Sequence, residues 1–197
     1  MREMIKMVLV LTILSSFSGG LLAALKNGTQ EKIEYQELQN VKGPAIEKIL
    51  EGCENDPIVD RFKVADGEQE RSFFVGIFDD KPKSIAFETY GKGFGGDIGV
   101  IVGVNLEDDS MIGAQVTTHN ETPGVGSKAK DDPSFVSQFA KTIITDSFGV
   151  KQDGGNIDAI AGATITSRGV CIAVTEAGEI YKRLKPEIVK QLEKFNK

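Results

Sequence analysis

The sequence has no tryptophan, one histidine and two cysteines in 197 residues. The two cysteines, Cys53 and Cys171, have neither a CxxC pairing nor histidine-rich neighbours. These shortages argue against a zinc site, which needs about four clustered Cys or His ligands. At most one disulfide is possible, and a buried free thiol is the expected state of Cys171, which falls on the apolar side of a predicted helix.

Positive charge is also scarce. Lys and Arg number 23 against 29 Asp and Glu, the formal net charge is −6, and no run of basic residues occurs. A protein that binds nucleic acid broadly presents an excess of positive charge, so we expect no nucleic-acid partner. The hydrophobic fraction of 40% is typical of a folded protein, and the length allows one ordinary domain plus an appendage.

The appendage is residues 7–25, which contain no charged side chain. This segment is long enough to cross the hydrocarbon core of a membrane as a helix. A cleaved signal peptide is the alternative, with Ala23 and Ala24 near the cleavage site, but its apolar core should be shorter. Basic residues flank the segment on both sides and set its orientation only weakly. We therefore expect a retained single-pass anchor whose N-terminus stays inside while the polar domain is exported.

Turn residues divide the remaining chain into segments whose apolar residues follow either a strand pattern or a helix pattern. Short β-branched and aromatic runs predict strands at residues 72–78, 84–90, 98–104 and 111–118. Apolar residues three and four apart predict helices at 44–52, from Ser134, and from Ser167 to a break at Pro186, with a short final helix beyond. Because the connections are short, an antiparallel meander is favoured.

The expected class is therefore α+β, with a transmembrane helix followed by a twisted antiparallel sheet flanked by helices. The expected organisation is a cytoplasmic start and anchor, a linker with an N-terminal helical segment, and one domain, over residues 1–26, 27–70 and 71–197.

Residues 158–167 read DAIAGATITS and hold most of the functional information. Gly162 and Ala163 precede the hydroxyl of Thr164, and Thr166 and Ser167 stand at the start of the predicted helix. Free backbone N–H groups and the helix dipole favour an anion at such a position. The segment predicts a phosphate site, while the plainer interpretation is a loop followed by a helix cap.

Two further segments are rich in turn-forming residues. Residues 119–126 read HNETPGVG after a predicted strand, where ligand-binding loops are common, although an exposed hairpin end is the simpler interpretation. His119 has no nucleophile nearby, so we expect a structural or orienting role for it. Residues 90–98 read YGKGFGGDI, which lacks the spacing of a nucleotide loop and indicates a bulge or tight turn beside a ligand.

Taken in order, these three segments resemble the FMN-binding domain family. The resemblance covers about residues 71–184 plus the anchor, and extends to the FMN-binding subunits of two membrane complexes: the G subunit of the Rnf complex and the C subunit of the sodium-translocating NADH:quinone reductase. HNETPGVG differs from the usual HxETPGLG by Val125, and Ala161 stands where the family often has Ser. The absence of a long insertion makes the chain more similar to the Rnf subunit.

The resemblance implies that Thr164 is esterified to the phosphate of FMN by a separate flavin transferase, with FAD as donor. Gly162, Ala163, Thr166 and Ser167 would then surround the phosphate. The phosphoester keeps a negative charge, which the helix N-terminus stabilises.

In the HNETPGVG segment, Glu121, Thr122 and the backbone around Gly124 can supply the polar contacts that an isoalloxazine ring needs, and Val125 can give it an apolar surface. The expected role is an electron relay on the outer, periplasmic face of the inner membrane, working with the other membrane and peripheral subunits of an Rnf-type complex. That complex couples ferredoxin oxidation and NAD reduction to ion movement. The chain would be a redox subunit of a multi-subunit oxidoreductase, with no complete activity alone. The alternatives are a cofactor-free membrane-anchored scaffold and a self-contained flavin enzyme.

Overall fold

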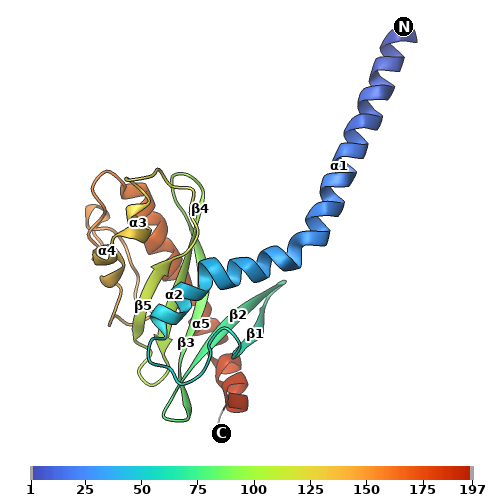
Figure 1. Ribbon diagram of the computed structural model, residues 1–197. Coiled ribbons are helices and arrows are strands. Elements are labelled where there is room, and N and C mark those ends of the chain that lie inside the picture. Colours follow the sequence, from blue (N-terminus) through green and yellow to red (C-terminus); the bar gives the residue numbers. More distant parts are fainter. Residues whose placement is uncertain (1, 196–197) are drawn as a thin grey trace. The chain divides into compact units, whose positions relative to one another are not determined.

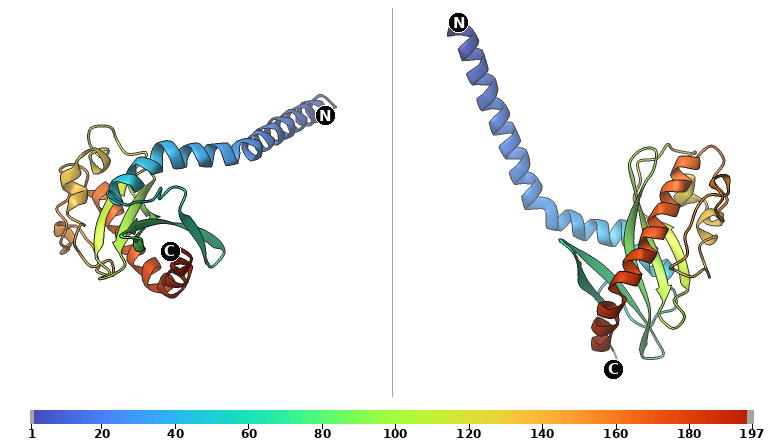
Figure 2. Two further views of the ribbon diagram at one scale, coloured as in Figure 1. Left: turned by 60° about the horizontal axis from the view of Figure 1, so that its bottom comes forward. Right: turned by 180° about the vertical axis from the view of Figure 1, so that it is seen from behind.

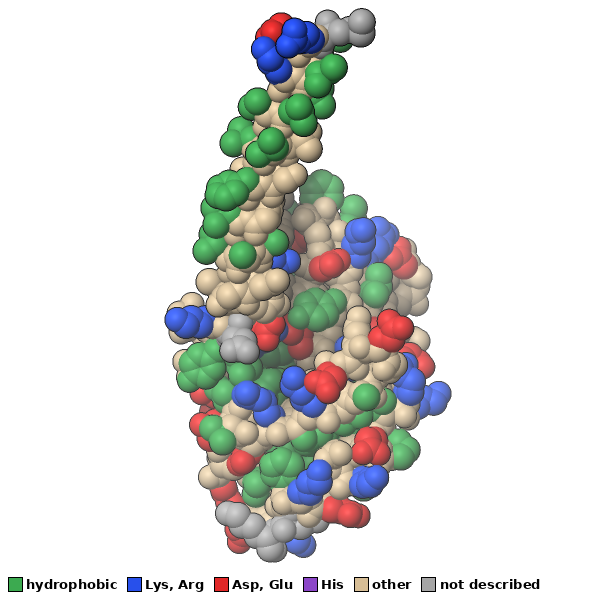
Figure 3. All heavy atoms as spheres, turned by 90° about the vertical axis from the view of Figure 1, so that its right-hand side faces the viewer, with side chains coloured by type: hydrophobic (Ala, Val, Ile, Leu, Met, Phe, Trp, Pro, Cys, Tyr) green, Lys and Arg blue, Asp and Glu red, His purple; other side chains and the backbone are tan. Residues whose placement is uncertain are grey.

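The computed structural model describes residues 2–195. It forms two compact units, one ending at Gln39 and the other beginning at Asn40. The first unit is helix α1 (Arg2–Glu37), in which residues 2–30 are apolar and long enough to cross a membrane by length and composition. Hydrophobic side chains are exposed along this helix, and charged ones gather at its N-terminal end (Figure 3). The expected anchor is thus helical, and the helix runs on through part of the predicted linker.

The second unit is built on a five-stranded antiparallel sheet whose strands follow one another in sequence order. The strands are β1 (Arg61–Asp66), β2 (Gln69–Phe78), β3 (Lys81–Lys92), β4 (Asp97–Asn105) and β5 (Met111–Val116). The helical elements are η1 (Leu38–Lys42), α2 (Gly43–Ile49), α3 (Lys128–Asp131), α4 (Pro133–Ser137), η2 (Lys151–Asp153), α5 (Thr164–Leu192) and η3 (Glu193–Phe195). The predicted α+β class and antiparallel meander are confirmed.

Helices cover both faces of the sheet, α5 on one and α2 on the other (Figures 1 and 2). The strands therefore carry apolar residues on both sides. On β2, Phe73 and Val75 belong to the main core with α5, while the intervening Phe74 is buried on the opposite face. Ile49 of α2 lies against Gly103 of β4, which has no side chain to exclude it. Both faces being buried explains why β4 reads as a continuous apolar run.

Helix α5 approaches β3 closely at one end of the sheet. A Cβ atom at Gly91 of β3 would lie 1.9 Å from the carbonyl oxygen of Gly169 in α5. The hydroxyl of Thr89 donates a hydrogen bond to the carbonyl oxygen of Ala173 at 2.9 Å. These contacts bring the first turns of α5 against the end of the β3–β4 hairpin, where the functional segments lie.

Two sequence predictions about α5 were wrong. The helix begins at Thr164, with Ala163 as N-cap, instead of being capped by Ser167, whose side chain is fully buried. It also continues through Pro186, where the sequence predicted that the helix would end. Proline removes one backbone hydrogen bond, but Ile188 and Leu192 beyond it are buried in the core, and their burial offsets that loss.

Two other elements differ from the predictions. Strand β1 lies in the segment expected to be linker and helix. The sequence does not predict it because it is an edge strand in which Val64 is the one buried residue, and it is ordered by pairing with β2. Helix α4 is capped by Asp132, which accepts a hydrogen bond from the backbone N–H of Ser134, and is shorter than expected. Ile144 is the buried residue of the following turn.

Both cysteines are free thiols, and Cys171 is buried as predicted. Burial disfavours the thiolate and raises the pKa of Cys171 to about 11. Cys171 therefore acts as a small apolar core residue at neutral pH.

The close approach of α5 to β3 can be tested by adding a methyl group at Gly91. Gly91→Ala should lower the free energy of unfolding by about 3 kcal/mol, because the new Cβ meets the backbone of α5. Gly113→Ala on β5 is the matched control: no atom lies within 4 Å of its Cβ position, and its effect should stay within about 1 kcal/mol. Urea unfolding of both variants measures the difference. Equal stabilities would mean that α5 does not approach β3 this closely.

Candidate functional site

Three segments that are distant in sequence meet at one end of the sheet, the upper end in Figure 1. They are the turn between β3 and β4, the segment that follows β5, and the first turn of α5. Each was singled out in the sequence, as YGKGFGGDI, HNETPGVG and DAIAGATITS respectively. The structure brings all three together.

Glu121 joins these three segments through its carboxylate. The side chain is buried, with Oε1 accepting a hydrogen bond from the backbone N–H of Gly95 at 2.7 Å and Oε2 accepting one from the hydroxyl of Thr166. One oxygen is thus used by the β3–β4 turn and the other by α5. A buried carboxylate is stable when its oxygens are matched by donors in this way.

Glycines make the close packing around Glu121 possible. A Cβ atom at Gly126 would lie 2.7 Å from the Cβ of Glu121, and one at Gly93 would lie 2.5 Å from its Oε1. A Cβ atom at Gly95 would lie 2.0 Å from the carbonyl oxygen of Asn120. The glycine-rich stretch after β3 therefore forms a tight turn against the neighbouring segment, as predicted.

The first turn of α5 presents unpaired backbone donors. Gly162 precedes it with φ +78° and is exposed. No side chain caps the helix, and the N–H groups of Thr164, Ile165 and Thr166 make no hydrogen bond within residues 2–195. These donors and the positive end of the helix dipole suit a bound anion.

The three hydroxyls of this turn differ in availability. Thr166 is buried and donates to Glu121. Ser167 is fully buried, and its hydroxyl donates to the carbonyl oxygen of Ala163 and accepts from the N–H of Ile160, each at 3.0 Å. Thr164 is half-buried, and its hydroxyl has no hydrogen-bond partner in the described part of the chain. Thr164 is therefore the one open hydroxyl of the three.

The remaining predicted site residues lie on an exposed turn. Thr122, Gly124 and Val125 are exposed, and Gly124 has φ +72° and donates its N–H to the hydroxyl of Ser127 at 2.9 Å. A Cγ atom of Val125 lies 3.8 Å from the Cβ position of Gly162. This turn thus lies beside the approach to Thr164, and the exposed Val125 provides an apolar surface there.

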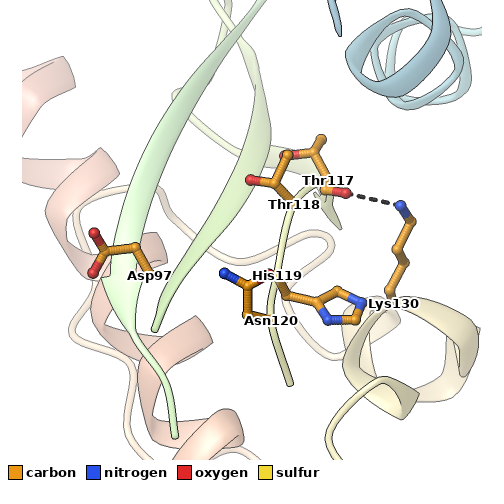
Figure 4. A pocket seen from close by; sticks show the side chains of 6 residues that line it. All are labelled: Asp97, Thr117, Thr118, His119, Asn120 and Lys130. Atoms are coloured by element: carbon orange, nitrogen blue, oxygen red, sulfur yellow. Dashed lines mark hydrogen bonds between the residues drawn. The ribbon is translucent and has the colours of Figure 1, made fainter. Parts of the chain in front are cut away.

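A polar pocket of about 410 Å³ adjoins this end of the sheet (Figure 4). Its walls are Asp97, Thr117, Thr118, His119, Asn120 and Lys130. The sequence indicates a role for His119 but none for Asp97 or Lys130. Lys130 comes from α3 and donates to the carbonyl oxygen of Thr117 at 2.8 Å, a contact that no sequence pattern signals.

His119 orients the Glu121 segment from inside this pocket. Its Nδ1 accepts a hydrogen bond from the backbone N–H of Glu121 at 3.2 Å. This agrees with the orienting role predicted for the single histidine. Within residues 2–195, no group of three or more His, Cys, Asp or Glu side chains could hold a metal ion.

Comparison with known proteins matches this part of the chain to a family model. The model described as FMN-binding domain matches residues 93–179, which include Glu121 and Thr164.

Similar proteins include the G subunits of ion-translocating oxidoreductase complexes. The one from Escherichia coli O157:H7 is 38% identical over 132 residues, which are 64% of this chain and 63% of that protein. The one from Cereibacter sphaeroides (strain ATCC 17029 / ATH 2.4.9) is 30% identical over 93% of this chain and 87% of its own length. The Salmonella typhi protein is 31% identical, over 91% and 92% respectively.

Two solved structures share the fold. The C subunit of the Na(+)-translocating NADH-quinone reductase from Parabacteroides distasonis superimposes with a TM-score of 0.51 at 26% identity, over 58% of this chain and 62% of that one. NqrC from Shewanella oneidensis superimposes with a TM-score of 0.50 at 25% identity, over 68% and 75%.

Because Thr164 and Thr166 have different roles, substitution by valine should change the stability of the domain differently at the two positions. Thr166→Val removes a donor from the buried Glu121 carboxylate and should lower the free energy of unfolding by about 2 kcal/mol. Thr164→Val removes a hydroxyl without a partner and should change it by less than about 0.5 kcal/mol. Chemical denaturation of the two variants tests this. A Thr166→Val variant as stable as Thr164→Val would mean that Glu121 does not depend on this donor.

Proposed function

The chain belongs to the family formed by the G subunits of ion-translocating oxidoreductase complexes, and on this basis we propose that it is an electron-transfer subunit of an Rnf-type complex with FMN esterified to Thr164. The family supports a redox subunit of a multi-subunit, membrane-associated enzyme that carries FMN. The covalent linkage, its position at Thr164 and the partner subunits are proposed.

One observation carries the assignment of Thr164. The hydroxyls of Thr166 and Ser167 are buried and engaged, whereas that of Thr164 is half-exposed and unpaired among the described residues. An enzyme that forms a phosphoester must reach the acceptor oxygen from solvent. Thr164 is accessible to such an enzyme in the folded domain, and the other two are not.

The residues around Thr164 fit a phosphate group. The free N–H groups of the first helical turn can donate to its oxygens, and the helix dipole favours its negative charge. Gly162 and Ala163 leave space beside the hydroxyl because neither carries a large side chain. When bound, FMN supplies a ring that accepts and releases electrons. The contribution of the chain is to hold the phosphate, orient the ring and tune its potential.

Maturation requires a second enzyme in this proposal. A flavin transferase would join the Thr164 oxygen to the FMN phosphorus of FAD. The O–H bond of Thr164 and the bond between that phosphorus and the AMP portion would break, and AMP would leave with the hydroxyl proton. The isoalloxazine ring is unchanged by this step. Its potential is therefore set by noncovalent neighbours such as Glu121 and by its exposure to solvent.

Helix α1 is the membrane anchor in this proposal. Its length and composition, together with relatives that are subunits of ion-translocating complexes, support a membrane-anchored protein. We further place it as a single-pass helix of the inner membrane, with the N-terminus inside and the domain on the outer, periplasmic face. A covalent tether is useful there because no free flavin pool replaces a lost cofactor. The partners are the other membrane and peripheral subunits of the complex.

The test of the attachment site is substitution of its hydroxyl. The full chain produced with a flavin transferase should give a band that fluoresces under ultraviolet light after denaturation. Thr164→Val should abolish this band, while Thr164→Ser, which keeps a hydroxyl, should retain it. An adduct that persists in Thr164→Val would move the acceptor to Thr166 or Ser167. A dark band for the unmodified sequence would favour the alternative, a cofactor-free membrane-anchored scaffold.

The charge of Glu121 should affect the flavin potential. Glu121→Gln keeps an oxygen for the N–H of Gly95 but removes a negative charge, so adding an electron to the flavin becomes easier. We expect attachment to persist and the midpoint potential to become more positive. Glu70→Gln, at an exposed carboxylate of β2, is the control and should leave the potential unchanged. If Glu121→Gln also left the potential unchanged, residues 119–126 would have only a structural role.

A further inference from the structure

Three large apolar side chains are exposed around the start of α5. Phe94 is 73% exposed, Ile165 is 47% exposed and Val125 is 40% exposed. Single exposed apolar residues are common on protein surfaces. Each of these three, however, comes from a different one of the segments joined by Glu121. They therefore belong to the same end of the domain as Thr164.

The turn that carries Phe94 is held firmly. The N–H of Gly93 donates to the carbonyl oxygen of Gly96 at 2.8 Å, and that of Gly95 donates to Glu121 at 2.7 Å. On the other side, Gly169 of α5 leaves space for the backbone at residues 92–93. The phenyl group is thus displayed from a fixed turn that lies against the first turns of α5.

The neighbours of Phe94 leave its ring uncovered. The turn reads Gly-Phe-Gly-Gly at residues 93–96, so the sequence neighbours of Phe94 have no side chains, and 73% of Phe94 is exposed. An exposed aromatic ring gains free energy when another planar, apolar ring covers it. The chemistry of Phe94 is therefore that of a stacking partner.

We propose that Phe94 is the stacking surface for the isoalloxazine ring of the flavin, with Val125 and Ile165 providing an apolar edge. This inference rests on the proposed attachment of FMN to Thr164. A ring tethered there by a flexible ribityl chain needs a noncovalent surface to hold it in one position. Stacking on Phe94 covers one face of the ring and leaves the other face open to a redox partner.

The lack of tryptophan in this chain allows a sharp test. An indole in contact with an excited flavin quenches its fluorescence by donating an electron. Phe94→Trp should therefore lower the fluorescence of the attached flavin several-fold. Val59→Trp is the matched control, because Val59 is 71% exposed but lies between α2 and β1, outside the three segments. Its fluorescence should equal that of the unsubstituted chain.

A second measurement uses removal of the Phe94 ring. Phe94→Ala should increase quenching of the flavin by iodide by up to about twofold, because the face of the flavin ring that Phe94 covers becomes exposed when stacking is lost. Both experiments use the full chain in detergent after flavin attachment, with loading measured by absorbance in denaturant. Denatured samples should show equal quenching.

The outcomes separate the two proposals. Loaded variants with unchanged fluorescence and unchanged iodide quenching would overturn the role of Phe94 and leave attachment to Thr164 standing. Changes that occur only when other subunits of the complex are present would assign the patch to a protein partner and also overturn it. Absence of covalent flavin from every sample, the unsubstituted chain included, would overturn the proposed function and this inference with it.

Discussion

The site depends on one buried carboxylate. Glu121 accepts hydrogen bonds from the N–H of Gly95 and the hydroxyl of Thr166, and so connects the β3–β4 turn, the segment after β5 and the start of α5. Removing either donor would leave a buried charge with an unmatched oxygen, which is costly in an apolar interior. A Cβ atom at Gly93 or Gly126 would meet the side chain of Glu121, and one at Gly95 would meet the backbone of Asn120. The position of Thr164 follows from this junction.

The same junction explains how similar hydroxyls have different roles within one helical turn. Thr166 is buried and donates a hydrogen bond to Glu121. Ser167 is buried and forms hydrogen bonds with the backbone of the preceding loop. Thr164, outside this network, stays open at the positive end of α5. Under the proposed function, a modifying enzyme would have one accessible oxygen, next to donors that can bind the phosphate it delivers. Structural and chemical roles are thus divided between neighbouring residues.

Much of this could be predicted from the sequence, but not the contacts that build the site. Apolar periodicity located four of the five strands and α5, and the family resemblance identified the FMN-binding domain. Strand β1 escaped because an edge strand with one buried side chain has little periodicity of its own. The continuation of α5 through Pro186 escaped because tertiary burial overrides a local propensity. The pairing of Glu121 with Thr166 joins residues 45 positions apart, and no single sequence marks such a pair. The sequence suggested both as cofactor contacts, and the structure adds that the hydroxyl of Thr166 donates a hydrogen bond to Glu121.

The most direct test is to locate the modification on the protein isolated from its own membrane. Fragmentation of the peptide that contains residues 158–167 would assign the added mass to one hydroxyl among three. The account predicts a mass increase equal to FMN less one water on Thr164, with Thr166 and Ser167 unmodified. The same mass on Thr166 or Ser167 would contradict it, since those hydroxyls are buried and engaged in the folded domain. An unmodified peptide would contradict the covalent flavin altogether.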